Sequence, residues 1–327
     1  MLPPMAIFFP LFTLLEDLGY LPRVAFNLDK YFKKACTCGK QALTMAMGFG
    51  CNAAGVVGCR IIDSPRERLI ATITNSFVPC NGRFPTLIAI ITMFFIGASA
   101  GFGTSLLSAV LLTAVILLGI LMTLLVSRLL SKTILKGVPS SFTLELPPYR
   151  RPQIGKVIVR SIFDRTLFVL GRAVAVAAPA GLLIWIMANV MVGDMSLLAH
   201  CSAFLDPFAR LLGMDGVILM AFILGFPANE VVFPIIIMAY MAGGTLTDMG
   251  NLSEMHTLLT ANGWTPVTAV CTMLFSLMHW PCSTTCMTIH KETASLKWTA
   301  ASFLIPTAAG MLLCFLVSSV AKLCGVG

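Results

Sequence analysis

The chain has 327 residues, of which 57% are hydrophobic and 11% charged, and its formal net charge is +8. Soluble domains carry about 25% charged residues, so this composition excludes an ordinary soluble domain and indicates an α-helical integral membrane protein. Lys and Arg gather between the apolar runs, which is typical of membrane topology, so we expect no binding of nucleic acid.

The first apolar runs predict one partial span and one broken helix. Met1–Leu15, which ends before Glu16 and Asp17, is shorter than the roughly 20 residues of a spanning helix and lacks a signal-peptide pattern. We therefore expect it to be the later part of a longer span. Arg23–Lys40 predicts an amphipathic helix at a membrane face. Ala42–Cys59 consists of small residues and predicts a closely packed, interrupted helix.

The remaining runs predict a protein with two membrane halves. Residues 84–96 and 102–126 are apolar and are separated by 97–101, and the segment that follows is rich in Lys and Arg. Later apolar runs cover 167–192, 216–240, 266–279 and 298–323, and the acidic stretches 194–215 and 241–265 are expected outside. We predict about seven to nine membrane segments. The expected division is 1–126 for the first membrane half, 127–166 for a basic cytoplasmic linker and 167–327 for the second membrane half.

One short pattern occurs twice in this apolar sequence. The first copy is Gly48-Phe49-Gly50-Cys51-Asn52, and the second is Gly225-Phe226-Pro227-Ala228-Asn229. Each copy is followed by a Pro-Cys pair, Pro79-Cys80 in the first and Pro281-Cys282 in the second. Helix-breaking polar residues at matching positions of two halves are the best sequence indication of a transporter's midplane site. The loop after the first copy is basic and the loop after the second is acidic, so we predict an all-α fold with two inverted repeats containing broken or re-entrant helices.

Glu230 is the carboxylate of the apolar run Val217–Tyr240. A charge at bilayer depth costs at least about 2.5 kcal/mol, so such a residue usually faces a cavity or a partner. Glu230 could bind a cation, relay a proton, or stay protonated in a hydrogen bond between helices, and the sequence leaves these alternatives open.

Cys51, Cys80 and Cys282 each lie beside a helix-breaking residue. A break exposes a thiol and backbone carbonyls to a cavity, which an unbroken helix does not do. Thiolates suit softer metals and carboxylate or amide oxygens suit harder ones, so Cys with Asn and Glu fits Fe²⁺, Mn²⁺ or Zn²⁺. The alternative is that each cysteine is a small packing residue.

Four further residues are supporting candidates. Asn52 and Asn229 could cap a broken helix or supply a ligand oxygen. His279 could be a buried core group or a transient ligand. Cys286 shares a face with Cys282 if their segment is helical. The sequence has no P-loop pattern, so we expect no enzyme activity of its own.

Several of these stretches together resemble a known family. They resemble the membrane domain of ferrous iron transport protein B, whose paired motifs are of the Gate, or nucleoside-recognition-like, type. The stretches are Leu14–Tyr20, Gly48–Asn52, Arg66–Leu69, Pro79–Arg83, Gly225–Glu230 and His279–Cys282.

The resemblance implies a multi-pass Fe²⁺ importer of the bacterial inner membrane. Cys51 and Cys80 would be gate cysteines of the first half, and Glu230 and Cys282 would serve the second. In this family GTP acts through an N-terminal GTPase domain, whose pattern this sequence does not include. The implied partners are the lipid bilayer, Fe²⁺, that GTPase domain, a small accessory protein and further copies of the chain.

Two alternatives to this function stay open. The chain could be a proton-coupled carrier of a nucleoside or another small organic solute, with Glu230 as the proton site and the cysteines as packing residues. It could also be a membrane scaffold that transports nothing.

Overall fold

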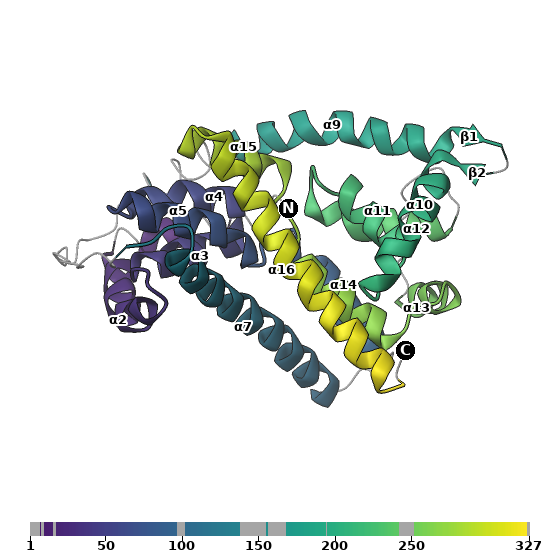
Figure 1. Ribbon diagram of the computed structural model, residues 1–327, viewed down its shortest axis with the longest axis horizontal. Coiled ribbons are helices and arrows are strands. Elements are labelled where there is room, and N and C mark those ends of the chain that lie inside the picture. The colour runs from purple at the N-terminus through teal and green to yellow at the C-terminus, as the bar shows by residue number, and fades with distance from the viewer. Residues whose placement is uncertain are drawn as a thin grey trace. The chain divides into compact units, whose positions relative to one another are not determined.

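The computed structural model describes residues 10–15, 18–96, 102–137, 168–193, 195–241 and 252–325, together with positions 7 and 155. Across these residues the chain is helical except for loops and one short hairpin, formed by β1 (Met191–Val192) and β2 (Met195–Ser196) (Figure 1). The all-α prediction is therefore confirmed. Glu16, Asp17, positions 97–101, most of the predicted linker and residues 242–251 lie outside the described residues.

The chain forms two compact units that are each assembled from separate stretches of sequence. The first unit comprises Met1–Asn81, Leu118–Val174 and Thr284–Ile305, and the second comprises Gly82–Leu117, Ala175–Ser283 and Pro306–Gly327. The division into 1–126, 127–166 and 167–327 follows the order of the chain and stays a prediction.

The first unit contains mostly short helices. They are α2 (Tyr20–Lys34), α3 (Lys40–Gly50), α4 (Asn52–Gly58), η1 (Cys59–Ile61), α5 (Pro65–Thr74), η2 (Asn75–Phe77), most of α15 (Ser283–Thr293) and parts of three longer helices. The α5 helix begins with Ser64 as N-cap and proline at its first position, both of which favour a helix start.

The amphipathic helix expected near the N-terminus is α2. Its buried side chains, Leu21, Ala25, Asp29 and Phe32, recur at helical spacing. Phe32 packs with Met45 and Val78 in one core cluster of the first unit.

The second unit contains the remaining elements. They are α6 (Phe84–Ile91), η3 (Thr92–Ile96), the hairpin, α10 (Leu197–Leu211), α11 (Gly216–Leu224), η5 (Asn229–Val231), α12 (Val232–Tyr240), α13 (Leu252–Ala261), α14 (Pro266–Met278) and parts of the same longer helices. The Phe222 and Phe275 rings meet edge to face with centroids 4.9 Å apart, which anchors α11 against α14 in the core.

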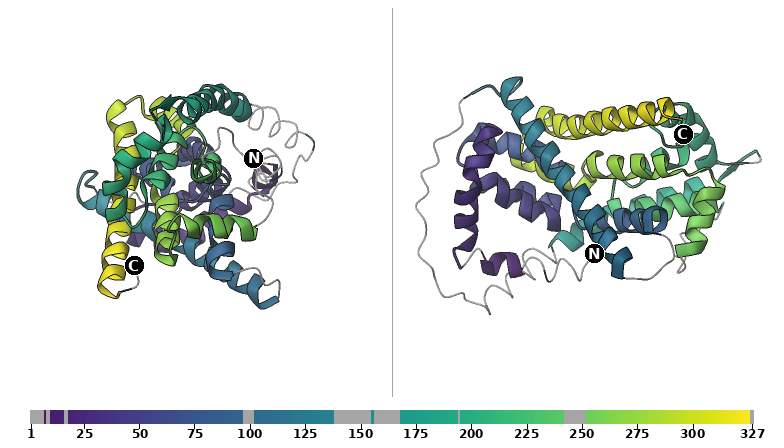
Figure 2. Two further views of the ribbon diagram at one scale, coloured as in Figure 1. Left: turned by 90° about the vertical axis from the view of Figure 1, so that its right-hand side faces the viewer. Right: turned by 90° about the horizontal axis from the view of Figure 1, so that it is seen from below.

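Three longer helices contribute residues to both units. They are α7 (Phe102–Lys132), α9 (Phe168–Asn189) and α16 (Leu296–Leu323). Figure 2 shows α7 and α16 unbroken from two further directions. Large apolar side chains stay exposed along both, among them Leu106, Leu117, Leu129, Leu312 and Val320. In a helix of this length such a surface is suited to lipid.

The described residues contain two helices that are long and apolar enough to cross a membrane, Gly103–Lys132 and Leu296–Leu323. A third candidate is the pair α10 and α11, which is bent by 110° at a short break. These helices fit a polytopic helical membrane protein. The larger count of seven to nine segments stays a prediction.

Candidate functional site

The helix that carries the first Gly-Phe-x-x-Asn pattern is interrupted. α3 ends at Gly50, Cys51 has extended backbone (φ −157°, ψ 125°), and α4 begins at Asn52. An interruption releases backbone N–H and C=O groups from the helical ladder, and at membrane depth such groups must be satisfied by protein or lie at a cavity. Cys51 is partly buried at this point.

The second unit has an interruption with nearly the same backbone. α11 ends at Leu224, and Ala228 is extended (φ −151°, ψ 115°) immediately before Asn229. The short helix η5 then leads into α12, and Glu230, its second residue, is partly buried. In both units, therefore, the residue before the asparagine is extended and the asparagine starts the next helix.

Asn52 holds the first break against the segment that precedes Cys80. With its amide nitrogen facing two carbonyl groups, Asn52 donates to Gly48 O at 3.1 Å and to Val78 O at 3.2 Å. Asn75 Nδ2 donates to Asn52 O at 2.9 Å. A Cβ on Gly48 would lie 2.9 Å from Asn75 Oδ1, and one on Gly55 would lie 2.7 Å from it. The two glycines thus leave the space that the amides occupy.

His279 and Asn229 form the matching contact in the second unit. His279 is 1% exposed, and its Nδ1 lies 3.1 Å from Phe275 O and 2.9 Å from Ser276 O. Since carbonyls only accept, Nδ1 donates to them. Nε2 lies 3.2 Å from Asn229 Oδ1. Both ring nitrogens are therefore engaged within the unit.

The Pro-Cys segment of the second unit is also tied directly to the break. Ser283 N donates to Phe226 O at 2.9 Å, and Ser283 Oγ donates to Pro227 O at 3.4 Å. Cys282, which lies between Pro281 and α15, is partly buried. Each unit thus joins its own Gly-Phe-x-x-Asn break to its own Pro-Cys segment.

Arg83 is a residue that the sequence pattern alone did not single out as functional. Its side chain is completely buried in the second unit. Nη1 donates to Leu277 O at 2.7 Å, and Nη2 donates to His279 O at 3.2 Å and to Trp280 O at 3.4 Å. These carbonyls lie at the C-terminal end of α14, where helix carbonyls lack partners within the helix. The guanidinium therefore fixes the segment that leads to Pro281 and Cys282.

The likeness between the units extends upstream of the repeated pattern. Asp29 Oδ1 accepts from Gly39 N at 2.8 Å, and Asp206 Oδ1 accepts from Gly216 N at 3.1 Å. Asp206 follows Asp29 by 206−29 = 177 positions, and Gly216 follows Gly39 by the same interval. The interval from Asn52 to Asn229 is identical. The two stretches therefore align without a gap over this whole region.

The helices before the two breaks also end in the same way. Cys36 (φ 61°) and Gly213 (φ 73°) have left-handed backbone after α2 and α10, respectively. In both cases the next residue donates its N–H to a carbonyl of the last turn at 3.1 Å. This is the geometry of a Schellman-type helix end. Aligning the chain with itself at the interval of 177 residues would have revealed these positions from sequence.

The four predicted metal ligands belong to different units. Cys51 and Cys80 are in the first unit, whereas Glu230 and Cys282 are in the second. Cys80 is buried, and the other three are partly buried, as is Cys286 in the first turn of α15. Among the described residues no three or more His, Cys, Asp or Glu side chains form a group that could hold a metal. The ligand set accordingly stays a prediction.

Two ion pairs hold the charged loop that follows the first break. Lys40 Nζ lies 2.5 Å from Asp63 Oδ2, and Arg60 binds both carboxylate oxygens of Glu292 at 2.7 Å. The Lys40 ammonium lowers the pKa of the Asp63 carboxyl below its ordinary value. Glu292 likewise raises the pKa of Arg60. Both shifts favour the charged forms.

Two family models match this sequence. The Gate model, described as "Nucleoside recognition", matches residues 1–95 and 170–296, which is more than half of the chain. A second model, described as "Ferrous iron transport protein B C terminus", matches residues 112–164.

The chain is also similar to several curated proteins. A Staphylococcus aureus (strain COL) protein named "Fe(2+) transporter FeoB" is 30% identical over 98% of this chain and 46% of its own length. A Campylobacter jejuni protein of the same name is 26% identical over 98% of this chain and 53% of its own length. A Porphyromonas gingivalis "Fe(2+) transport protein A/Fe(2+) transporter FeoB fusion protein" is 24% identical over 97% of this chain and 42% of its own length.

The chain spans about half the length of the curated relatives it matches. No solved structure matches it. One break lies within each of the two segments that the Gate model matches. The second model covers part of the stretch between these segments. The chain therefore belongs to the ferrous iron transport protein B family, and it corresponds to the membrane region that carries the Gate domain.

Proposed function

We propose that the chain forms the permeation part of a ferrous iron uptake system in a bacterial inner membrane. The names of its relatives and its apolar helices support this function. Fe²⁺ is then the transported ion, and the protein is a permease rather than an enzyme.

The observation that carries this proposal is the duplicated break. Cys51 directly precedes Asn52, and Glu230 directly follows Asn229, so the positions beside equivalent asparagines carry a thiol in one unit and a carboxylate in the other. Cys80 and Cys282 lie in the segments that are docked to these breaks. Sulfur and oxygen ligands together suit a borderline cation such as Fe²⁺. We assign the metal-handling role to Cys51, Cys80, Glu230 and Cys282.

The supporting residues have a mechanical role in this proposal. Asn52 and Asn229 hold each broken helix to its Pro-Cys segment, and His279 anchors Asn229. Cys286 lies four residues after Cys282 and would be available as a further thiol ligand. Since both nitrogens of His279 are engaged, His279 would bind the ion only if Asn229 moved away.

The two broken elements are proposed to be inverted repeats of the Gate type. This arrangement would let equivalent elements serve opposite sides of the membrane, as in other transporters built from repeats. GTP would act through a GTPase domain outside this chain. A small accessory protein is a further proposed partner, because one relative is named as a fusion with "Fe(2+) transport protein A". We also propose that copies of the chain associate.

The test is equilibrium binding of Fe²⁺ to the purified chain under anaerobic conditions, measured by competition with a coloured ferrous chelator. Cys51→Ser, Cys282→Ser and Glu230→Gln should each weaken binding by at least about tenfold, since changes outside the first shell of a metal site already cost that much. Cys324→Ser is the matched control, because Cys324 is exposed at the end of the chain. It should bind Fe²⁺ as the unchanged protein does.

Retention of full Fe²⁺ affinity by the folded Cys51→Ser and Cys282→Ser variants would contradict the assignment and leave these cysteines as packing residues. Circular dichroism and thermal unfolding of each variant separate a lost ligand from a lost fold. Absence of Fe²⁺ binding by the unchanged chain would contradict the proposed function itself.

A second candidate function rests on the description of the Gate model as "Nucleoside recognition". In that case Glu230 would exchange a proton and the ligand would be a nucleoside. Stabilisation of the chain against heating by nucleosides, with no response to Fe²⁺, would favour this carrier. No response to either ligand would favour a membrane scaffold.

A further inference from the structure

Two cysteines of the second unit meet where α14 packs against α16. Cys271 and Cys314 are both free thiols, and both are 0% exposed. Cys314 Sγ donates to Cys271 O at 3.3 Å, and Cys271 Sγ donates to Cys314 O at 3.9 Å. The two side chains also interact directly with each other. Neither cysteine is among the metal ligands proposed above.

These reciprocal contacts place the two thiols in reach of a disulfide. A disulfide needs Cα atoms no more than about 7 Å apart and side chains that point toward one another. Each thiol here lies at the backbone carbonyl of the other cysteine, so Cys271 and Cys314 stand at the same level of adjoining helices. Rotation of the side chains about their Cα–Cβ bonds is then sufficient to bring sulfur to sulfur.

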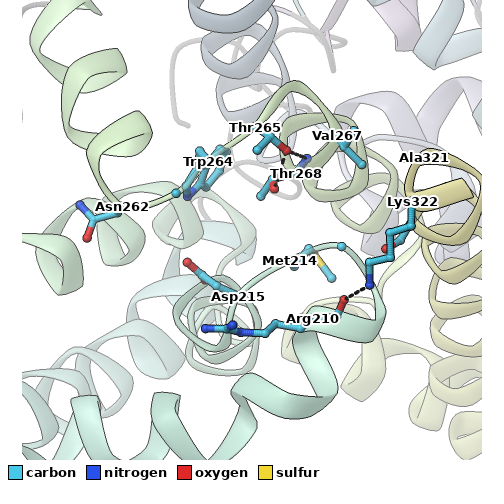
Figure 3. A pocket seen from close by; sticks show the side chains of 13 residues that line it. Arg210, Met214, Asp215, Asn262, Trp264, Thr265, Val267, Thr268, Ala321 and Lys322 are labelled. Carbon is cyan, nitrogen blue, oxygen red and sulfur yellow. Dashed lines mark hydrogen bonds between the residues drawn. The ribbon is translucent and has the colours of Figure 1, made fainter. Parts of the chain in front are cut away.

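A cavity of about 430 Å³ lies next to this thiol pair. Its lining includes Thr268, which precedes Cys271 by three residues on α14, and Ser318, which follows Cys314 by four residues on α16. Residues at these spacings share one face of a helix. Figure 3 shows Thr268 from α14 and Ala321 from α16 in the lining. The thiols therefore lie one helical turn below the cavity on both helices.

Gly213 lies between the cavity and the Cys271 thiol. It lines the cavity, and a Cβ built on it would lie 2.8 Å from Cys271 Sγ and 3.1 Å from Ser318 Cβ. Its left-handed backbone (φ 73°) also favours glycine at this position. Since Gly213 has no side chain, a small neutral molecule in the cavity needs only a local movement of the chain to reach the sulfur.

We propose that Cys271 and Cys314 form a reversible disulfide when hydrogen peroxide enters this cavity. The Cys271 thiolate attacks one peroxide oxygen, the O–O bond breaks, and a sulfenic acid and hydroxide form. The Lys322 ammonium in the cavity lining is an attractive charge for that thiolate.

The second step joins the two helices. The Cys314 sulfur attacks the Cys271 sulfur, the S–O bond breaks, and the S–S bond forms. The protons of both thiols leave with the peroxide oxygens as two water molecules. The two sulfurs together lose two electrons, which the peroxide oxygens gain, and a small thiol compound reverses the reaction by thiol–disulfide exchange.

The disulfide acts on the segment that is docked to the second break. α14 ends at Met278, directly before His279 and the Pro281-Cys282 pair. A covalent link from α14 to α16 restrains the helix that positions these residues. The thiol pair is thus a redox-sensitive modification site in the support of the second break.

The test is mass spectrometry of the purified full chain, first reduced, then freed of reductant and exposed to hydrogen peroxide. Free thiols are blocked with N-ethylmaleimide in denaturant, and the chain is digested without reductant. A peptide pair joined through Cys271 and Cys314 should appear, lighter than the two reduced peptides by two hydrogen atoms. Dithiothreitol should separate it. The oxidised chain should also unfold at a temperature several degrees above that of the reduced chain.

Two variants and a second oxidant serve as controls. Cys324→Ser is the matched control, because Cys324 is exposed at the end of the chain, and the joined pair should form in it as in the unchanged chain. Cys314→Ser should lack both the joined pair and the rise in unfolding temperature. Oxidised glutathione, which is large and charged, should leave Cys271 and Cys314 reduced because it does not pass Gly213.

Three outcomes would overturn the proposal. Recovery of both cysteines as maleimide adducts after peroxide treatment would show that no disulfide forms. A link from Cys271 or Cys314 to a different cysteine would show that the pairing is wrong. Equal yields of the joined pair with oxidised glutathione and with peroxide would exclude the route through the cavity. Fe²⁺ binding is not a readout here, so the outcome is independent of the proposed transport function.

Discussion

Arg83 shows how a single side chain organises one of the Pro-Cys segments. A buried guanidinium is costly unless hydrogen bonds compensate its loss of solvent, and here Nη1 donates to Leu277 O and Nη2 donates to His279 O and Trp280 O. Cys80 precedes Arg83 by three positions in the sequence. Within the second unit, Arg83 therefore supplies the donors that fix the carbonyls before Pro281 and Cys282.

Replacing Arg83 should weaken the second unit markedly. Arg83→Gln would leave buried carbonyls without donors, at about 1–3 kcal/mol for each unsatisfied group. Arg83→Lys keeps the charge but loses the planar fork of donors, so it should recover only part of the stability. Thermal unfolding in detergent, followed by tryptophan fluorescence, measures the difference.

Arg128→Gln is the control for this prediction, because Arg128 is exposed on α7. It should change the unfolding temperature little. An Arg83→Gln variant as stable as the Arg128→Gln variant would contradict the structural role given to the guanidinium.

Just before each broken helix, the backbone at a glycine packs closely against the backbone of the preceding helix. A Cβ on Gly39 would collide with the carbonyl oxygen of Ala25, and one on Gly216 would collide with that of Ser202. The Asp29 and Asp206 carboxylates accept from the N–H groups of these same glycines. The repeated glycine thus sets how closely α3 approaches α2 and α11 approaches α10.

Gly39→Ala and Gly216→Ala should each destabilise the protein by about 1–3 kcal/mol or more, because the added methyl group meets backbone rather than a side chain that can move. Gly181→Ala within α9 is the matched control, since no atom lies within 4 Å of its added Cβ. It should raise stability by roughly 0.5–1 kcal/mol through helix propensity. Unfolding temperatures measure both effects. Equal behaviour of Gly216→Ala and Gly181→Ala would contradict the close approach.

Sequence reasoning located the breaks because their signals are local. Helices are interrupted by glycine, proline and asparagine, and each break carries such residues within five positions. They are Gly48 and Asn52 in the first break and Gly225 and Pro227 in the second. The partners were not predictable in this way. The Asn229 partner His279 is 50 residues away, and the Arg83 partner Leu277 is 194 residues away. No local pattern encodes contacts at that separation, since they depend on how the helices pack.

At the scale of the whole molecule, the two units contain equivalent but separate hydrogen-bond networks. The hydrogen bonds described for the Asn52 and Asn229 side chains share no residue. Stability should therefore respond to the two asparagines independently, whereas Fe²⁺ binding should require both if each unit contributes ligands.

Asn52→Ala, Asn229→Ala and the double variant test this distinction. Each single change leaves buried groups without partners and should cost about 1–3 kcal/mol. In the double variant the two losses of stability should add to within about 0.5 kcal/mol. Asn189→Ala is the control, because Asn189 is exposed at the end of α9, where its amide donates to Trp185 O.

The losses of Fe²⁺ affinity in the two single variants should not add up in the double variant. If an ion needs ligands from both broken elements, either single change removes most of the affinity and the second change removes little more, because the site is already incomplete. Chelator competition on the same protein samples measures this at a temperature where all variants are folded. An Asn229→Ala variant that keeps full Fe²⁺ affinity would show that the first unit binds the ion alone, and Glu230 and Cys282 would then lose their proposed role.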